Sequence, residues 1–408
     1  MKADIPIPDE VLQLSDILGV ELFVVGGVVR DYLFHILHGF TFDPKDIDIA
    51  TAEHPDTILR LLREPKAKRA GVVPLEIGKS FGVVAAVFPS GNKYEIATFR
   101  SEWYDPITGD GRHPDKVEFS TPQADAQRRD LTVNSLFYEI ANREIVDYVG
   151  TGIDDVKGKI IRTVGNPLDR FGEDKLRVVR LIRFFSRYNS CGDINDLEVW
   201  RPSTLAAIEK FKTLPGISGE RIRNEFLSGI TQAITPSHFL RTCHHLGLMP
   251  AMFPGITPTE LSITSRNPHI ILAAMFGQEP IKGLCDALNQ SKYSADEVRH
   301  VKFLRSLDSL SYDRAYEFVR MRGQFCNLVL SEQDQAINKA ALDREVEDYC
   351  HAVNLDVHLP LKLMEFEPIT RATSFPELSG PELGSAIREE VGREFMMFAQ
   401  IAPSPCAS

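Results

Sequence analysis

The sequence predicts an α+β N-terminal region followed by an all-α remainder. Short apolar runs typical of strands alternate with a helical pattern up to about residue 145, and apolar residues then recur with helical periodicity. With 408 residues the chain exceeds the usual size of a single hydrophobic core, so we expect two or more domains.

The elements of the first region follow from local patterns. The apolar residues 22–25 predict a strand, residues 28–37 a helix, and 46–51 a second strand. Residues 80–88 and 93–100 predict paired strands, because the turn signal "PSGN" separates them.

A stretch rich in Pro, Gly and Asp follows, and the pattern then becomes helical. Residues 101–122 show no helical period, and we expect a long mobile loop with a functional role. Residues 173–188 and 218–234 each predict an amphipathic helix. Helical stretches broken by Pro and Gly continue beyond residue 235.

The composition is that of a soluble globular protein, with 43% hydrophobic and 25% charged residues. No apolar run approaches the roughly 18–20 residues that a membrane helix needs, and the start "MKADIPIPDE" argues against a secretory signal. Six scattered cysteines without a CxxC pair predict reduced cytoplasmic thiols. A formal charge of −11 disfavours broad nonspecific binding of nucleic acid but leaves local basic patches open.

Two aspartates in "DPKDIDIAT" form a candidate metal site. Side chains two apart on a strand point the same way, so Asp46 and Asp48 are expected to project together. Two adjacent carboxylates repel each other unless a cation lies between them, and Mg²⁺ is the natural candidate. The alternative is a solvated strand edge.

Two glycines in "VVGGVVRDYL" separate the first strand from the helix. Gly26 and Gly27 allow the backbone to approach a ligand closely, and the helix start offers N–H groups to an anion. We expect a triphosphate to bridge this turn to a metal on the aspartates, with Arg30 neutralising it. Asp31 is as well explained by the helix dipole as by a direct role.

Glu95 is a third candidate carboxylate. Strand alternation places Glu95 with Ala97 and Phe99, which we expect to be the buried face. It is a candidate general base or further metal ligand, and the alternative is a salt bridge to Arg100 or another basic residue.

Six ordered blocks between about residues 22 and 230 carry a family resemblance: "GGVVRD", "DIDIAT", "RRDLTVNSLFY", "DYVGTGIDD", "EDKLRVVRLIRFFSRY" and "ERIRNEF". The chain resembles the class II tRNA CCA-adding enzymes and bacterial poly(A) polymerases of the nucleotidyltransferase superfamily. The resemblance implies a nucleotidyltransferase head with a small mixed sheet at 1–145, a helical neck at 146–235 that recognises the base, and a helical body and tail at 236–408 that bind RNA. The block "DYVGTGIDD" is one residue longer than the usual pattern, which puts a hinge-like role of this turn in doubt.

The resemblance also assigns roles to single residues. It implies that Asp46 and Asp48 hold Mg²⁺, that Gly27 and Arg30 contact the nucleotide, and that three residues of "RRDLTVN" bind triphosphate and ribose, namely Arg129, Asp130 and Asn134.

Base selection can be argued from hydrogen-bonding chemistry. Asp174 and Arg177 lie three apart on the expected helix and therefore share a face. A carboxylate accepts and a guanidinium donates, which matches the adjacent donor and acceptor of cytosine and adenine and rejects uracil and guanine. Arg180 and Arg183 extend a basic stripe toward Arg187. The alternative is an intrahelical ion-pair network, for instance between Glu173 and Arg177.

The predicted function is addition of C and A to the 3′ end of tRNA from CTP and ATP. The alternatives are a poly(A) polymerase or a partial CC- or A-adding enzyme, and, in another class, a non-catalytic RNA-binding module. "IGKSFGVV" modestly favours the tRNA enzyme, because it lacks a "GRR/GRK-F" stretch. Arg112 of the 101–122 loop is expected to act when the site changes from C to A addition. The histidine pairs at 35/38 and 244/245 lack a surrounding ligand set and do not predict zinc.

Overall fold

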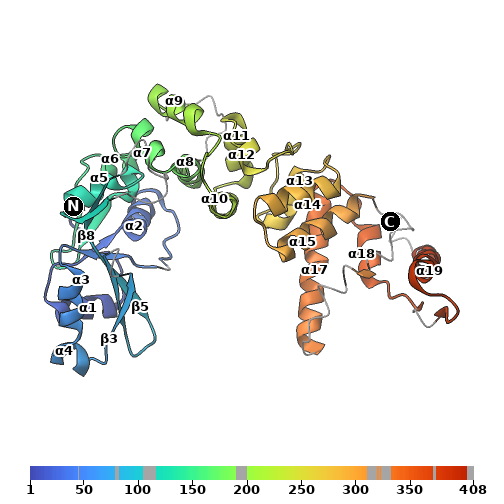
Figure 1. Ribbon diagram of the computed structural model, residues 1–408, viewed down its shortest axis with the longest axis horizontal. Helices are drawn as coiled ribbons and strands as arrows, with labels where there is room; N and C mark the ends of the chain where they lie inside the picture. The colour runs from blue at the N-terminus through green and yellow to red at the C-terminus, as the bar shows by residue number, and fades with distance from the viewer. Residues whose placement is uncertain are drawn as a thin grey trace. The chain divides into compact units, whose positions relative to one another are not determined.

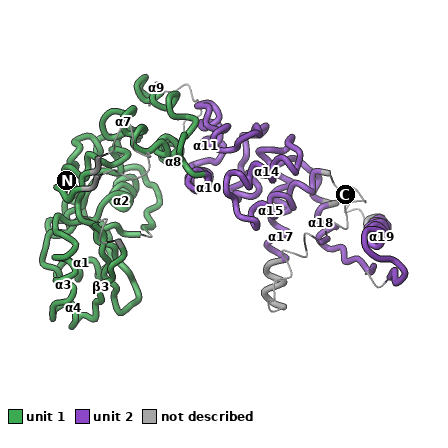
Figure 2. The backbone as a smooth tube through the Cα atoms, in the orientation of Figure 1, with its two compact units in different colours: residues 1–218 green, residues 219–408 purple. Residues whose placement is uncertain are grey.

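The chain divides into two compact units, Met1–Ser218 and Gly219–Ser408 (Figure 2). The computed structural model describes residues 1–44, 46–78, 82–103, 116–189, 200–309, 319–320, 322, 332–370 and 374–401. The finer division into head, neck, body and tail stays a prediction.

A seven-stranded mixed sheet forms the centre of the first unit, in the order β3-β4-β5-β2-β1-β8-β9 (Figure 1). Its strands are β1 (Phe23–Val25), β2 (Ile49–Thr51), β3 (Val73–Gly78), β4 (Val83–Val87), β5 (Lys93–Thr98), β8 (Leu136–Glu139) and β9 (Glu144–Asp147). Only the pairing of β2 with β5 is parallel; the other neighbours are antiparallel. The expected mixed sheet is confirmed, as is the antiparallel pair on either side of "PSGN".

The helices of this unit lie before, between and after the strands along the chain. They are α1 (Asp9–Leu18), α2 (Gly27–His38), α3 (Pro55–Leu62), α4 (Pro65–Arg69), α5 (Pro122–Arg128), η2 (Thr132–Asn134), α6 (Gly152–Gly158), α7 (Pro167–Glu173), α8 (Arg177–Tyr188) and α9 (Pro202–Phe211). The predicted helix at 28–37 is confirmed as α2, which contacts β1, β8 and α6.

Two predictions for this region are wrong. The two ends of the expected loop at 101–122 instead form an antiparallel ribbon, because β6 (Arg100–Trp103) pairs with β7 (Lys116–Phe119), and α5 begins at Pro122. Residues 104–115 of that loop lie outside the described residues. The expected single helix at 173–188 is broken, because the chain leaves helical geometry at Asp174 before α8 begins.

An aromatic cluster holds the middle of the sheet. The ring centroid of Phe23 on β1 lies 5.5 Å from that of Phe99 and 6.2 Å from that of Phe137 on β8. These buried rings pack with Val25 and Ala50 in one core cluster. Their burial fixes β1 and β2 side by side, and both candidate motifs border these two strands.

The described residues of the second unit form helices and the segments that connect them. It contains α10 (Gly219–Gln232), α11 (Pro236–His245), α12 (Met249–Met252), α13 (Pro268–Met275), α14 (Ile281–Gln290), α15 (Ala295–Ser306), η4 (Leu307–Ser309), α17 (Glu332–Ala352), α18 (His358–Glu365) and α19 (Gly380–Ile401). The predicted helix at 218–234 is confirmed as α10. No helix in the described part of the chain has the length and apolar character to span a membrane.

A buried arginine donates hydrogen bonds to carbonyl groups at the end of a helix in this unit. Arg305 donates from Nη1 to the Phe276 carbonyl at 2.6 Å and from Nη2 to the Gly277 carbonyl at 2.8 Å. These bonds satisfy carbonyl groups just beyond the end of α13, which would otherwise be buried without donors.

Candidate active site

The aspartate pair lies immediately before β2. The strand begins at Ile49, so the prediction that Asp46 and Asp48 lie within it is wrong. The reason is that β1 ends at Val25, and the backbone N–H of Val25 makes the last bond of this ladder, to the Asp48 carbonyl at 3.0 Å.

Exposure nevertheless alternates along this segment as it does on a strand. Asp46 and Asp48 are exposed, Ile47 is half-buried and Ile49 is buried. The two carboxylates are therefore presented to solvent while the isoleucines turn toward the protein.

Parallel pairing brings Glu95 beside the aspartates. Ile49 of β2 lies opposite Ile96 of β5, so the residues just before them in the chain, Asp48 and Glu95, are neighbours. A pocket of about 650 Å³ opens here and is lined by Asp46, Asp48 and Glu95.

The electrostatics of Asp48 reflect this grouping. Surrounding protein atoms limit the hydration of its carboxyl and raise its pKa, and the nearby charges of Asp46 and Glu95 raise it further. The charge of Arg129 acts in the opposite direction. Three carboxylates and one guanidinium thus lie within mutual electrostatic reach, and a divalent cation would relieve the repulsion between the acids.

The expected burial of Glu95 is wrong. Its side chain is 50% exposed and pairs with Lys93, whose Nζ lies 2.8 Å from Oε1. The buried face of β5 carries Tyr94, Ile96 and Thr98 instead, because this is the face that packs into the protein core. Glu95 therefore needs no buried partner, and its carboxylate reaches the pocket from the open face.

The glycine turn has the geometry that glycine alone adopts easily. Gly26 has φ +71° and ψ −118° and precedes the first residue of α2, Gly27. A Cβ atom on Gly26 would lie 3.2 Å from Nη1 of Arg129. The absence of this atom lets the Arg129 guanidinium approach the turn.

Arg129 is held by a buried carboxylate. Its Nε and Nη2 donate to Oδ2 of Asp125 at 3.1 and 3.0 Å, and its Nη1 donates to the Asn134 carbonyl at 3.2 Å. Burial alone would raise the pKa of Asp125, but the charges of Arg129 and Arg128 lower it below its usual range. Asp125 was not among the predicted site residues; its position four residues before Arg129, which directly follows α5, was the available signal.

Arg30 lies inside the protein in this structure. Its residue is 6% exposed, and Nε donates to Asp31 at 2.8 Å and to the Tyr188 hydroxyl at 2.9 Å. Nη1 donates to Oδ1 of Asn134 at 2.5 Å. The expected contact of Arg30 with a nucleotide stays a prediction, while the structure gives Arg30 a role in joining α2 to α8.

Asp31 completes this junction. Its Oδ2 lies 3.1 Å from Nη2 of Arg187, and its Oδ1 accepts from Tyr188 at 2.5 Å. Burial alone would raise the pKa of Asp31, but Arg30 and Arg187 lower it. Besides the helix-dipole role considered for it, Asp31 therefore forms ion pairs with Arg30 and Arg187. No local sequence pattern indicated these pairs.

Asp130 and Asn134 form a second polar link to α8. Asn134 donates from Nδ2 to Oδ1 of Asp130 at 3.0 Å, and Arg180 donates from Nε to Oδ2 of Asp130 at 2.8 Å. Arg183 is buried, and its guanidinium lies 4.2 Å from the centroid of the Phe184 ring. Arg180 of the basic stripe on α8 therefore contacts Asp130, and part of its side chain is exposed to solvent.

The helical argument for base selection is wrong in its geometry. Asp174 has φ −147° and ψ 108° and lies between α7 and α8, so it does not share a helix face with Arg177. The Arg177 side chain instead donates from Nη1 to Oε2 of Glu173 at 2.5 Å, which is the ion pair considered as the alternative. Roles of Asp174 and Arg177 in base recognition stay predictions.

Two further predictions concern loops. Asp147 organises the turn "DYVGTGIDD", because its carboxylate accepts from the backbone N–H groups of Val149, Gly150 and Ile153. Arg112 lies outside the described residues.

Comparison with known proteins identifies the first region. Residues 22–162 match the poly A polymerase head domain. It is 33% identical over 243 residues to the CCA-adding enzyme of Bacillus velezensis, a match that covers 59% of this chain and 54% of that protein.

A second relative and a solved structure are similar to the chain in the same way. The chain is 37% identical over 268 residues to the mitochondrial CCA tRNA nucleotidyltransferase 1 of Homo sapiens, covering 63% of this chain and 56% of that protein. The chain thus spans about half the length of the curated relatives it matches. Its fold resembles that of the Bacillus stearothermophilus CCA-adding enzyme in complex with CTP, with a TM-score of 0.58, 20% identity, and coverage of 94% and 90% of the two chains.

Proposed function

We propose that the protein is a tRNA nucleotidyltransferase that adds C and A to the 3′ end of tRNA from CTP and ATP. The observation that carries this proposal is the meeting of Asp46, Asp48 and Glu95 at one pocket of a poly(A) polymerase head domain. The names of the relatives support the choice of substrate, since they are a CCA-adding enzyme and a CCA tRNA nucleotidyltransferase.

The carboxylates suit a hard divalent cation, and Mg²⁺ is the ion we propose. Asp46 and Asp48 are exposed, lie two residues apart and offer only oxygen donors. Mg²⁺ held there would lower the pKa of the RNA 3′ hydroxyl and stabilise negative charge on the phosphates.

The proposed reaction is a displacement at the α-phosphorus of the nucleoside triphosphate. The RNA 3′ oxygen forms a bond to this phosphorus, the bond to the β-phosphate oxygen breaks, and pyrophosphate leaves. Glu95 is placed to accept the hydroxyl proton or to complete the metal site. Arg129 and the Gly26–Gly27 turn would receive the triphosphate, because Arg129 already lies within electrostatic reach of Asp48.

Base recognition is assigned to the helical part of unit 1. Asp174 would accept from the amino group of cytosine or adenine, and Arg177 would donate to the adjacent ring nitrogen. Arg177 would then exchange or share its bond with Glu173. We assign Asp130 and Asn134 to the ribose.

The wider roles complete the proposal. Arg180 and Arg183 would hold triphosphate or RNA backbone, as would Arg30 if its internal bonds open. The head at 1–145, neck at 146–235, and body and tail at 236–408 would carry catalysis, base recognition and RNA binding, in a cytoplasmic protein. A poly(A) polymerase or a partial CC- or A-adding enzyme is the second candidate, because the matched head domain is described by poly(A) polymerase.

Purified protein incubated with Mg²⁺ and tRNAs that end before, within or after CCA tests the proposal, with CTP and ATP supplied singly and together. We expect incorporation of C and then A that stops at CCA. Long A tails would favour the second candidate, and no incorporation would overturn both.

A matched pair of variants assigns the reaction to the pocket. Asp48→Asn removes a carboxylate charge there and is expected to lower the rate at least about 100-fold, since the metal loses a ligand. Asp154→Asn makes the same change at an exposed carboxylate that pairs with Lys157 on α6, and the rate is expected to be unchanged. Equal rates for Asp48→Asn and the wild type would show that the chemistry occurs elsewhere.

A further inference from the structure

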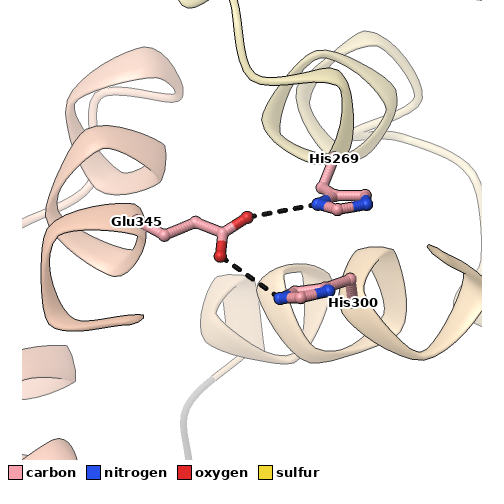
Figure 3. A group of neighbouring side chains, drawn as sticks. All are labelled: His269, His300 and Glu345. Carbon is pink, nitrogen blue, oxygen red and sulfur yellow. Dashed lines mark ion pairs between the residues drawn. The ribbon is translucent and has the colours of Figure 1, made fainter. Parts of the chain in front are cut away.

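Three side chains from separate helices of the second unit converge on one point (Figure 3). His269 comes from the first turn of α13, His300 from the middle of α15 and Glu345 from α17. One nitrogen of each ring and a carboxylate oxygen all lie within 4.8 Å of one another. The residues are 31 and 45 positions apart along the chain, so the arrangement depends on helix packing rather than on local sequence.

Each histidine nitrogen lies near a different oxygen of the Glu345 carboxylate. Nδ1 of His269 lies 3.4 Å from Oε1 of Glu345, and Nε2 of His300 lies 3.3 Å from Oε2. Both are longer than the 2.7–2.9 Å typical of a charge-assisted hydrogen bond. Ligands about 2.05 Å from a tetrahedral zinc ion stand about 3.3 Å apart, so each nitrogen lies at a ligand-to-ligand distance from its nearest carboxylate oxygen.

We propose that His269, His300 and Glu345 bind a divalent transition-metal ion of the zinc class. Two imidazole nitrogens and one carboxylate oxygen supply three ligands, and water supplies the fourth. The site is separate from the proposed Mg²⁺ carboxylates, whose donors are oxygen alone, and it does not depend on the proposed function. Its role is to tie α13, α15 and α17 together.

A neighbouring amide side chain orients the Glu345 carboxylate. Asn267 donates from Nδ2 to Oε1 of Glu345 at 2.9 Å, and this bond orients the carboxyl group as outer-shell partners do in metal sites.

The ligands are also accessible. The side chains of His269 and His300 are each 25% exposed, and that of Glu345 is 13% exposed. An ion can enter from solvent without unfolding the helices. The imidazoles stack, with centroids 4.3 Å apart and planes 10° apart, so one ring must turn about its χ2 angle for both nitrogens to point at the same ion.

Zinc binding to the full chain tests the proposal without use of enzymatic activity. The Asp46→Asn/Asp48→Asn chain serves as the background, so that the head carboxylates do not contribute. Titration calorimetry with Zn²⁺ is expected to show one site per chain. Co²⁺ in place of Zn²⁺ is expected to give the visible absorption of a low-symmetry site with nitrogen ligands.

Substitutions assign the ion to this cluster. In that background His300→Gln and Glu345→Gln each preserve size and are expected to weaken Zn²⁺ binding at least 10-fold. His244→Gln/His245→Gln changes two exposed histidines on α11 of the same unit and is expected to leave Zn²⁺ affinity unchanged. Circular dichroism on each variant establishes that the helices remain folded.

Three results would overturn the proposal. They are the absence of one-to-one Zn²⁺ binding, binding that His300→Gln and Glu345→Gln leave intact in folded protein, and equal loss in the His244→Gln/His245→Gln control. The first would mean that the cluster is a hydrogen-bonded ion pair between histidines and glutamate without a metal.

Discussion

Asp130→Asn tests how strongly the polar link between the sheet region and α8 contributes to stability. The Asp130 side chain is 11% exposed, and that of Arg180 is 33% exposed. Oδ1 of Asp130 accepts from the Leu131 N–H at 2.8 Å and from Asn134 at 3.0 Å, and Oδ2 accepts from Arg180 at 2.8 Å. The substitution keeps the shape and replaces the oxygen that faces Arg180 with an NH₂ donor.

The size of the effect follows from these contacts. Removing one partner of a buried ion pair costs about 3–5 kcal/mol. The bonds to Oδ1 survive in the variant, and the partly exposed Arg180 can turn toward water. We therefore expect the free energy of unfolding of unit 1 to fall by about 2–3 kcal/mol, below the full cost of a buried pair.

Tryptophan fluorescence during urea unfolding measures this unit selectively. The chain has two tryptophans, Trp103 and Trp200, and both belong to Met1–Ser218. Trp200 is buried against Phe185, so its emission reports the packing of α8. Asp154→Asn, on exposed surface of the same unit, is the control and is expected to leave the urea midpoint unchanged. A midpoint for Asp130→Asn equal to that of the control would refute the reasoning.

The effect is also expected to depend on pH. Burial alone would raise the pKa of Asp130, but Arg180, the bond from Asn134 and the charge of Arg177 hold it well below its usual range. The pKa of an aspartate in the unfolded chain is about 3.9. The stabilisation is therefore complete above that pH and is lost as the pH falls toward the lower pKa of the folded state. The stability difference between wild type and Asp130→Asn should shrink progressively below about pH 4.

Two other substitutions probe backbone and side-chain constraints near the site. Gly26→Ala is expected to lower the free energy of unfolding by about 1–3 kcal/mol, because φ +71° with ψ −118° is strained for any residue with a Cβ. Gly27→Ala, at a helical position, is the control and should leave the free energy of unfolding unchanged. Equal effects of the two substitutions would contradict this account. Tyr188→Phe is expected to cost about 1–3 kcal/mol, because its hydroxyl donates to Asp31 at 2.5 Å and accepts from the buried Arg30 at 2.9 Å. An unchanged urea midpoint for Tyr188→Phe would show that water replaces the hydroxyl.

The parts of the site that the sequence predicted well depend on neighbours in sequence. The Gly26–Gly27 turn joins a strand to the helix that follows it, and the signal for both elements is local. The exposure of Asp46 and Asp48 follows from alternation with two isoleucines, even though the strand itself begins at Ile49, three residues later than predicted. Local periodicity is sufficient for such features.

The wrong predictions depend on which surface each segment contacts. The alternation of β5 was correct, but the sequence does not state which of its faces packs into the core, and Glu95 was placed on the wrong one. Arg30 obtains its burial from Tyr188, which lies 158 residues away, so no local pattern indicates it. The helix break at Asp174 likewise interrupts a run whose apolar periodicity continues through it.

The arginines expected to bind a nucleotide are already oriented by carboxylates in the folded chain. Asp125 holds Arg129, Asp130 holds Arg180 and Glu173 holds Arg177. This is a physical advantage for phosphate binding, because a guanidinium fixed in place loses less side-chain entropy when the ligand arrives. Net charge averages over the whole surface, so a formal charge of −11 does not prevent a triphosphate from binding where several arginines are held in place.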